Sequence, residues 1–212
     1  MLLHSDSAIP VLFMFLLSFS PTKISKLDLI RCTSKVNVTT ILPVQEEAKI
    51  KMAFGPSGGC MWFDKEDPIC QSTFHLRPSP TYLHLPEDET LTEKLGNTNG
   101  LALVHIVTGL VSLGYIFWIL GPFIPGCFEI SNALMLLATI WGMITLIVIA
   151  GYKLSIDKHL KGDSAVPEFK TEYGGGLGIF IVGLFFILCG LLGTVGTARK
   201  TKRKDPPPVA KV

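Results

Sequence analysis

The fold of this chain is decided by one stretch, LALVHIVTGLVSLGYIFWILGPFIPGCFEISNALMLLATIWGMITLIVIAGY (Leu101–Tyr152). It contains two apolar segments, Leu101–Ile124 and Ile130–Tyr152, and neither holds an Asp, Glu, Lys or Arg. Each is at least as long as the roughly 20 residues that a helix needs to cross about 30 Å of hydrocarbon. A soluble helix would carry a polar face with a period of 3.6 residues, and these segments lack one. We therefore expect two antiparallel membrane-spanning helices, joined by a tight turn rich in Gly and Pro over Gly121–Glu129.

Two further apolar segments complete the expected bundle. Gly174–Ala198 carries no ionisable side chain and predicts another span. The N-terminal run Ala8–Ser20 is short and contains Pro10; we interpret it as the core of a first span, with a cleaved signal peptide as the alternative. The expected fold is thus an all-α membrane protein, one domain over 1–212 with a four-helix transmembrane bundle, its spans at about 8–28, 101–124, 130–152 and 174–198.

The distribution of charge predicts the orientation of the chain. Only 17% of the residues are charged, against about 25% in an ordinary soluble domain. The densest basic cluster next to a span consists of Arg199, Lys200, Lys202, Arg203 and Lys204. Positive residues favour the cytoplasmic side, so the tail 199–212 is expected inside and the loops 29–99 and 153–173 outside. These basic residues either act only as a stop signal or also bind anionic lipid at the inner surface.

The first outer loop carries the residues that suggest chemistry outside the membrane. Cys60 and Cys70 are spaced so that they can close a small ring, which stabilises by about 2–3 kcal/mol in the chain-entropy estimate. A metal site is a poor alternative, because no second cysteine pair stands at the required spacing. Asn37 opens an Asn-Val-Thr sequon, which predicts glycosylation if the loop is outside.

Several short motifs resemble one family. Phe54, Gly55, Gly58 and Cys60 form a Phe-Gly-x-x-Gly-x-Cys motif, and Cys70 is the second cysteine; His105 closes a Leu-Val-x-His element, and a Tyr-Gly-Gly-Gly-Leu run occupies Tyr173–Leu177. These features are similar to those of the fungal PalI-type tetraspan proteins, pH-response regulators and eisosome-associated relatives within the claudin-like superfamily. The resemblance implies a small β-rich sheet in the first outer loop, over roughly residues 36–74. Together with the short spacing, it also implies that Cys60 pairs with Cys70 and that Cys32 is not their partner.

The function implied by the resemblance is non-enzymatic. It suggests a multi-pass plasma-membrane accessory or scaffold protein that supports an ambient-pH sensor complex. The alternatives are a structural organiser of a membrane subdomain and a channel or transporter subunit. The expected partners are the lipid bilayer and another membrane protein, either a sensor or a like subunit, with no nucleic acid, cofactor, metal or catalytic residue. His105 stands inside a span, where an ionisable residue suggests a function; the alternative is a neutral imidazole that is hydrogen-bonded to a neighbouring helix or lies at the interface.

Overall fold

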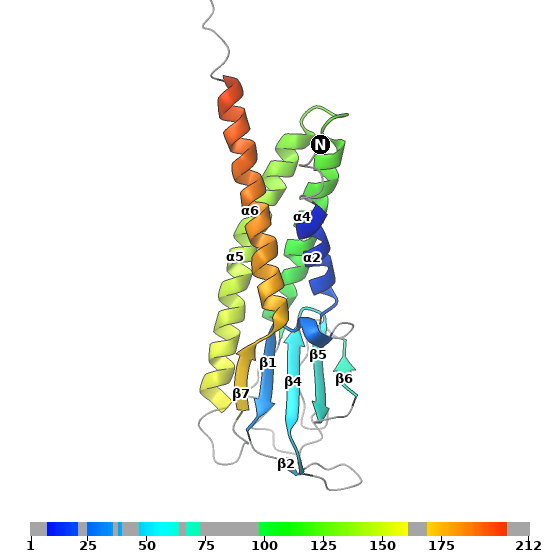
Figure 1. The fold of residues 1–212 in the computed structure, drawn as a ribbon, viewed down its shortest axis with the longest axis vertical. Coiled ribbons are helices and arrows are strands. Elements are labelled where there is room, and N and C mark those ends of the chain that lie inside the picture. The colour runs from blue at the N-terminus through cyan, green and yellow to red at the C-terminus, as the bar shows by residue number, and fades with distance from the viewer. Residues whose placement is uncertain are drawn as a thin grey trace, which may run out of the picture.

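The computed structural model describes residues 8–20, 25–35, 38–39, 47–63, 67–72, 98–160 and 169–202. A helical bundle forms one end of the molecule and an antiparallel sheet forms the other (Figure 1). Most of the described residues are helical. The helices are α2 (Ala8–Ser18), α4 (Leu103–Leu120), α5 (Cys127–Leu160) and α6 (Gly175–Lys202), with short 3-10 segments η1 (Ser25–Leu27) and η2 (Asn99–Ala102).

Three of these helices are long and apolar enough to cross a membrane. They comprise Asn99–Leu120, Cys127–Lys158 and Gly175–Leu192. The predicted first span over 8–28 is wrong in its extent, because α2 has 11 residues and a rise of only about 16 Å. The chain turns after Ser18, and Pro21 disfavours helical geometry in the residue before it. The part of the chain that the structure describes therefore holds three candidate spans where the sequence predicts four.

The boundaries of the last two spans also differ from the prediction. α5 has 34 residues, a length of about 51 Å, so it continues well past Tyr152 into the predicted second outer loop. This continuation is polar: Lys153 Nζ lies 2.5 Å from Asp157 Oδ2, an ion pair one helical turn apart. α6 likewise continues past Ala198 to Lys202, so the predicted tail begins inside a helix.

The sheet joins the two loops that the sequence predicts to be outside. Its strand order is β6-β5-β4-β1-β7, formed by Ile69–Gln71, Gly58–Phe63, Ile50–Gly55, Ile30–Ser34 and Phe169–Tyr173. A separate two-stranded pair consists of β2 (Val38–Thr39) and β3 (Glu47–Ala48). The expected range 36–74 therefore misses β1 and β7. β7 comes from the second outer loop and pairs antiparallel with β1, so that Ile30 faces Tyr173 and Ser34 faces Phe169.

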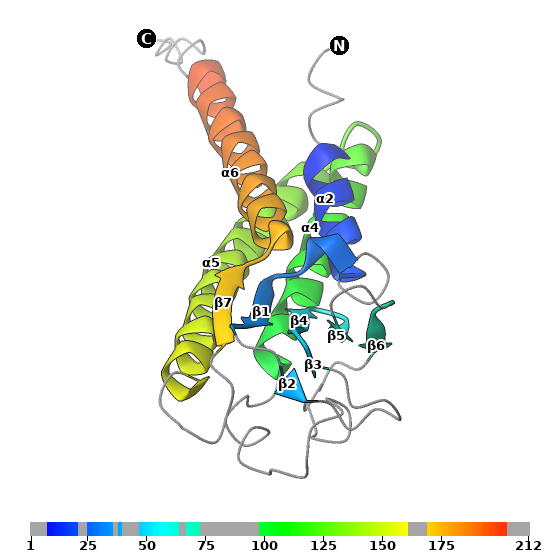
Figure 2. The same cartoon turned by 60° about the horizontal axis from the view of Figure 1, so that its bottom comes forward.

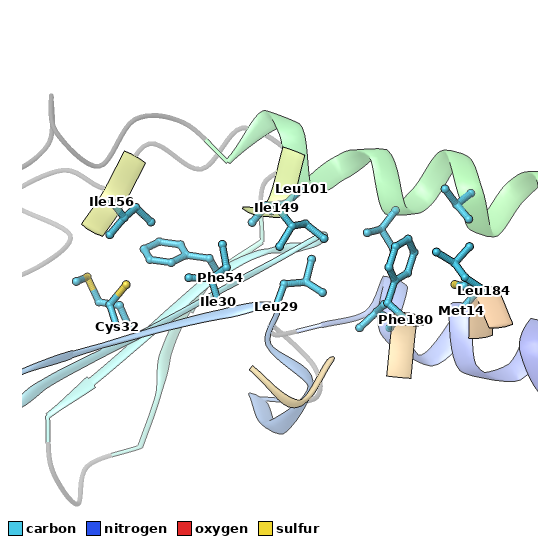
Figure 3. Packing of buried hydrophobic residues seen from close by; sticks show 14 of the residues in the cluster. Met14, Leu29, Ile30, Cys32, Phe54, Leu101, Ile149, Ile156, Phe180 and Leu184 are labelled. Carbon is cyan, nitrogen blue, oxygen red and sulfur yellow. The ribbon is translucent and has the colours of Figure 1, made fainter. Parts of the chain in front are cut away.

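One face of the sheet packs against the helices. Side chains alternate between the faces of a strand, and on β1 the residues Ile30, Cys32 and Ser34 are buried. The C-terminal end of α5 packs against β7, as the turned view shows (Figure 2). Buried apolar residues then continue without interruption from the sheet into the bundle (Figure 3): from Cys32 and Phe54, through Leu29, Ile149 and Leu101, to Phe180, Met14 and Leu184.

Small residues bring the helices close together. A Cβ built at Gly142 of α5 would lie 3.0 Å from Leu184 Cδ1 of α6 and nearer still to Cδ2. A hydroxyl contact links α2 to α4, where Ser18 Oγ donates to Thr108 Oγ1 at 2.9 Å. Close approach over small residues and interhelical hydrogen bonds are the usual basis of helix association in lipid.

Candidate functional site

The turn between β4 and β5, residues Gly55–Gly58, docks on the helices. Gly58 has φ 131°, a conformation that an L side chain rarely adopts, so glycine is required there. The backbone N–H and the hydroxyl of Ser57 both donate to the carbonyl oxygen of Ser20, at 2.9 and 2.6 Å. On the other side, His105 Nε2 lies 3.0 Å from the carbonyl oxygen of Pro56. The turn therefore connects the end of the N-terminal helical segment to the beginning of α4.

The contact of His105 fixes which ring nitrogen carries hydrogen. A carbonyl oxygen only accepts, so Nε2 must donate the hydrogen. The imidazole thus bonds to the carbonyl of a turn, whereas the structural interpretation expected a partner on a neighbouring helix.

Phe54 places the rest of the motif against the bundle. Its ring is buried and packs edge-on against the ring of Tyr152 on α5, with centroids 6.3 Å apart and an interplanar angle of 83°. The carbonyl oxygen of Phe54 also accepts a 2.9 Å hydrogen bond from the Leu29 N–H. Phe54, Gly55, Gly58 and His105 therefore meet where the sheet joins the helices.

A disulfide holds the edge of the sheet. Cys60 on β5 and Cys70 on β6 are bonded, and they stand directly opposite each other in the strand register. The pairing of Ala53 with Cys60 puts this disulfide on the face opposite to that of Cys32 and Phe54. The bond ties the short edge strand β6, whose residues are exposed, to the body of the sheet.

Cys32 is a buried thiol on the other face. It is not in a disulfide and has no exposed surface. Desolvation by burial raises the pKa of Cys32 to about 12; the carboxylate of Asp157 adds to the rise, and Lys153 opposes it. The thiol is therefore neutral and inaccessible, so Cys32 is unsuited to link two copies of the chain.

The glycine run Gly174–Gly176, at the start of α6, packs backbone to backbone against the segment before β1. A Cβ at Gly176 would lie 2.7 Å from Leu17 Cδ1 and 2.8 Å from the carbonyl carbon of Leu27. A Cβ at Gly174 would lie 2.6 Å from the carbonyl carbon of Asp28. Hydrogen bonds of 2.9 Å run from Gly174 N to the oxygen of Leu29 and from Gly176 N to that of Asp28. We call this contact the glycine junction; it holds β7 in register beside β1.

A buried carboxylate lies at the glycine junction. The side chain of Asp28 is fully buried and accepts two hydrogen bonds from Arg31, both at 2.9 Å. Such a bidentate pair gives each carboxylate oxygen one charge-assisted hydrogen bond. The sequence analysis missed this pair and the role of Gly174 and Gly176; the run of three glycines was the only available signal.

The remaining predicted residues are not gathered at this site. Asn37, Arg203 and Lys204 lie outside the described residues, while Arg199, Lys200 and Lys202 belong to the last turns of α6. Among the described residues, no three His, Cys, Asp or Glu side chains come together as metal ligands would.

Comparisons with known proteins give no identification. No protein-family model matches the chain, and no curated protein matches it.

Proposed function

We propose that this chain is a non-enzymatic accessory or scaffold subunit of the plasma membrane, similar to the fungal PalI-type regulators that support an ambient-pH sensor complex. In this proposal the molecule is a four-helix, claudin-like tetraspan protein with its C-terminus in the cytoplasm. Its partner is another membrane protein, and the sheet is the part that meets that partner outside the cell.

The observation that carries the proposal is the joining of both outer loops into one sheet. β7 pairs with β1, the glycine junction fixes α6 beneath them, and the turn at Gly55–Gly58 is bonded to Ser20 and His105. A sheet fixed to the helices at several points is a rigid surface, and rigid surfaces bind partners with a smaller loss of conformational entropy. The motif residues hold this surface in place, which suits a scaffold.

In the alternative function, a structural organiser of a membrane subdomain, the same sheet surface binds a second copy of the chain.

The channel or transporter alternative has less support. The hydroxyls of Ser18 and Thr108 bond to each other across α2 and α4, and Ser131 Oγ donates to the Gly114 oxygen across α5 and α4. These polar groups are used to join helices, whereas a transport path needs polar groups that line a cavity.

Affinity purification from native membranes in mild detergent tests the proposal. We expect a membrane protein to co-purify with the wild-type chain. Gly176→Ala, which disturbs the glycine junction, should lower that yield, whereas Gly178→Ala on the same helix should not. Co-purification of like subunits alone would favour the subdomain organiser. Recovery of no membrane protein from well-expressed wild type would contradict the scaffold function.

Orientation is tested separately with introduced cysteines at Ser72, which is exposed after β6, and at Thr201 near the end of α6. Impermeant thiol reagents applied to intact cells should label the first and not the second. If the Thr201→Cys variant is labelled and the Ser72→Cys variant is not, the orientation is opposite to the one proposed.

A further inference from the structure

The turn between α4 and α5 has an unusual surface for a loop. It lies at the opposite end of the bundle from the sheet (Figure 1). Phe123 is 80% exposed and Ile124 is 49% exposed, which makes Phe123 the most exposed large apolar side chain among the described residues. No Asp, Glu, Lys or Arg occurs from residue 98 to residue 128, and the exposed Glu129 in the first turn of α5 is the first charged residue after them. A turn in water would ordinarily be polar, and an exposed apolar patch indicates a contact with another surface.

The exposed apolar surface continues from the turn onto both helices. On α4 it includes Ile116, Ile119 and Leu120, and on α5 it includes Phe128 and Ile130 followed by Leu136, Leu137 and Ile140. These positions belong to candidate membrane spans, where exposed apolar side chains face lipid. The turn therefore belongs to the same surface as the lipid-facing sides of the two helices.

Four backbone N–H groups of the turn are hydrogen-bonded within the chain. Gly121 N donates to the Trp118 oxygen at 3.2 Å. The N–H groups of Phe123 and Ile124 both donate to the oxygen of Leu120, at 2.9 and 3.0 Å. Further along, Cys127 N donates to the Ile124 oxygen at 3.3 Å.

The three other residues of this part of the turn are Pro122 and Pro125, which have no N–H to satisfy, and Gly126, whose oxygen accepts from the N–H groups of Glu129 and Ile130 at 3.1 Å. Internal bonding of this kind is what a segment needs when no water reaches it, because an unsatisfied N–H in lipid costs several kcal/mol.

The depth of the turn follows from helix packing. Gly142 of α5 contacts Leu184 of α6. Cys127 and Arg199 each lie fifteen residues from that contact along antiparallel helices, about 22 Å in either case. The turn is thus level with the start of the basic cluster of α6, and lysines and arginines beside a span generally favour the headgroup region.

We propose that the α4–α5 turn is inserted into the interfacial layer of the bilayer, with Phe123 as its anchor among the lipid headgroups and upper acyl chains. Trp and Tyr are enriched in this layer, and Phe is common on the buried face of interfacial segments. The partner of the turn is lipid. On this side of the membrane the α4–α5 turn then offers no loop to a soluble partner. The inference does not depend on which side is cytoplasmic.

Depth-dependent fluorescence quenching tests the inference in the purified full chain, reconstituted in nanodiscs. Phe123→Trp is introduced with Trp62, Trp118 and Trp141 changed to Phe, so that the new indole is the only emitter. We expect blue-shifted emission, several-fold stronger quenching by lipids brominated near the headgroup than by lipids brominated at the chain end, and little quenching by aqueous iodide. Ser72→Trp in the same background is the matched control and should respond to iodide alone.

A red-shifted emission from Phe123→Trp, quenched by iodide and insensitive to brominated lipid, would overturn the inference. Strongest quenching by lipids brominated at the chain end would also contradict it, because the turn would then lie too deep. The measurement uses symmetric bilayers without partner proteins, so its outcome is independent of the scaffold function.

Discussion

Replacing Gly176 by alanine should loosen the glycine junction between α6 and the segment before β1. The new Cβ would lie 2.7 Å from Leu17 Cδ1 and 2.8 Å from the carbonyl carbon of Leu27. Carbon atoms in contact normally stay 3.5–4.0 Å apart, so the backbones must separate by about 1 Å. That movement also strains the 2.9 Å hydrogen bond from Gly176 N to the Asp28 oxygen.

The expected loss of stability follows from these contributions. Overpacking costs about 1–3 kcal/mol and the weakened hydrogen bond about 1 kcal/mol. The higher helix propensity of alanine raises the free energy of unfolding by about 1 kcal/mol relative to glycine and partly offsets this loss. The free energy of unfolding should therefore fall by about 2 kcal/mol, which lowers the folded-to-unfolded ratio by roughly 30-fold.

The buried thiol of Cys32 provides the assay. With Cys127 and Cys189 changed to alanine, Cys32 is the only free thiol, because Cys60 and Cys70 are bonded. A thiol-reactive dye should label Cys32 only when heating opens the sheet. Gly176→Ala should lower the midpoint of labelling. Gly178→Ala meets nothing within 4 Å and should leave the midpoint unchanged or raise it. A midpoint for Gly176→Ala equal to or above that of Gly178→Ala would refute the reasoning.

Three further predictions concern the sheet and its attachment. Cys60→Ser or Cys70→Ser should expose the other cysteine to alkylation and cost about 2–3 kcal/mol, while Cys32→Ala should leave the disulfide intact; non-reducing mass spectrometry that finds Cys32 linked to either would contradict this. His105→Phe should leave the Pro56 oxygen without its donor and lower the free energy of unfolding by about 1–3 kcal/mol, whereas His105→Gln can still donate a hydrogen bond and should lose less; equal unfolding midpoints for the two variants would argue against the hydrogen bond. Tyr152→Phe should raise stability by about 1 kcal/mol, because the Tyr152 hydroxyl is buried without a hydrogen-bond partner; a lower midpoint would instead indicate a bound water that satisfies it.

Local chemistry in the sequence was enough to locate the apolar helices. The absence of charge over Leu101–Leu120 and over Gly175–Leu192 excludes an ordinary soluble helix, and Gly121 with Pro122 marks the end of α4. Hydropathy does not report where a helix ends once it leaves lipid, which is why the extension of α5 to Leu160 was missed. Its polar residues, including Lys153 and Asp157, are those of an ordinary soluble helix.

The sequence by itself determined that the chain has long apolar helices and a cysteine spacing fit for a small ring, because both depend on residues that are near one another along the chain. Only the tertiary structure decided that β7 joins β1. Ile30 and Tyr173 come from different loops, and the sequence of a strand does not identify the distant strand with which it pairs. The contacts of the glycine junction and the hydrogen bond of His105 were likewise decided only by the tertiary structure. Each depends on how closely two remote backbones approach, and that distance is set when the sheet packs on the helices.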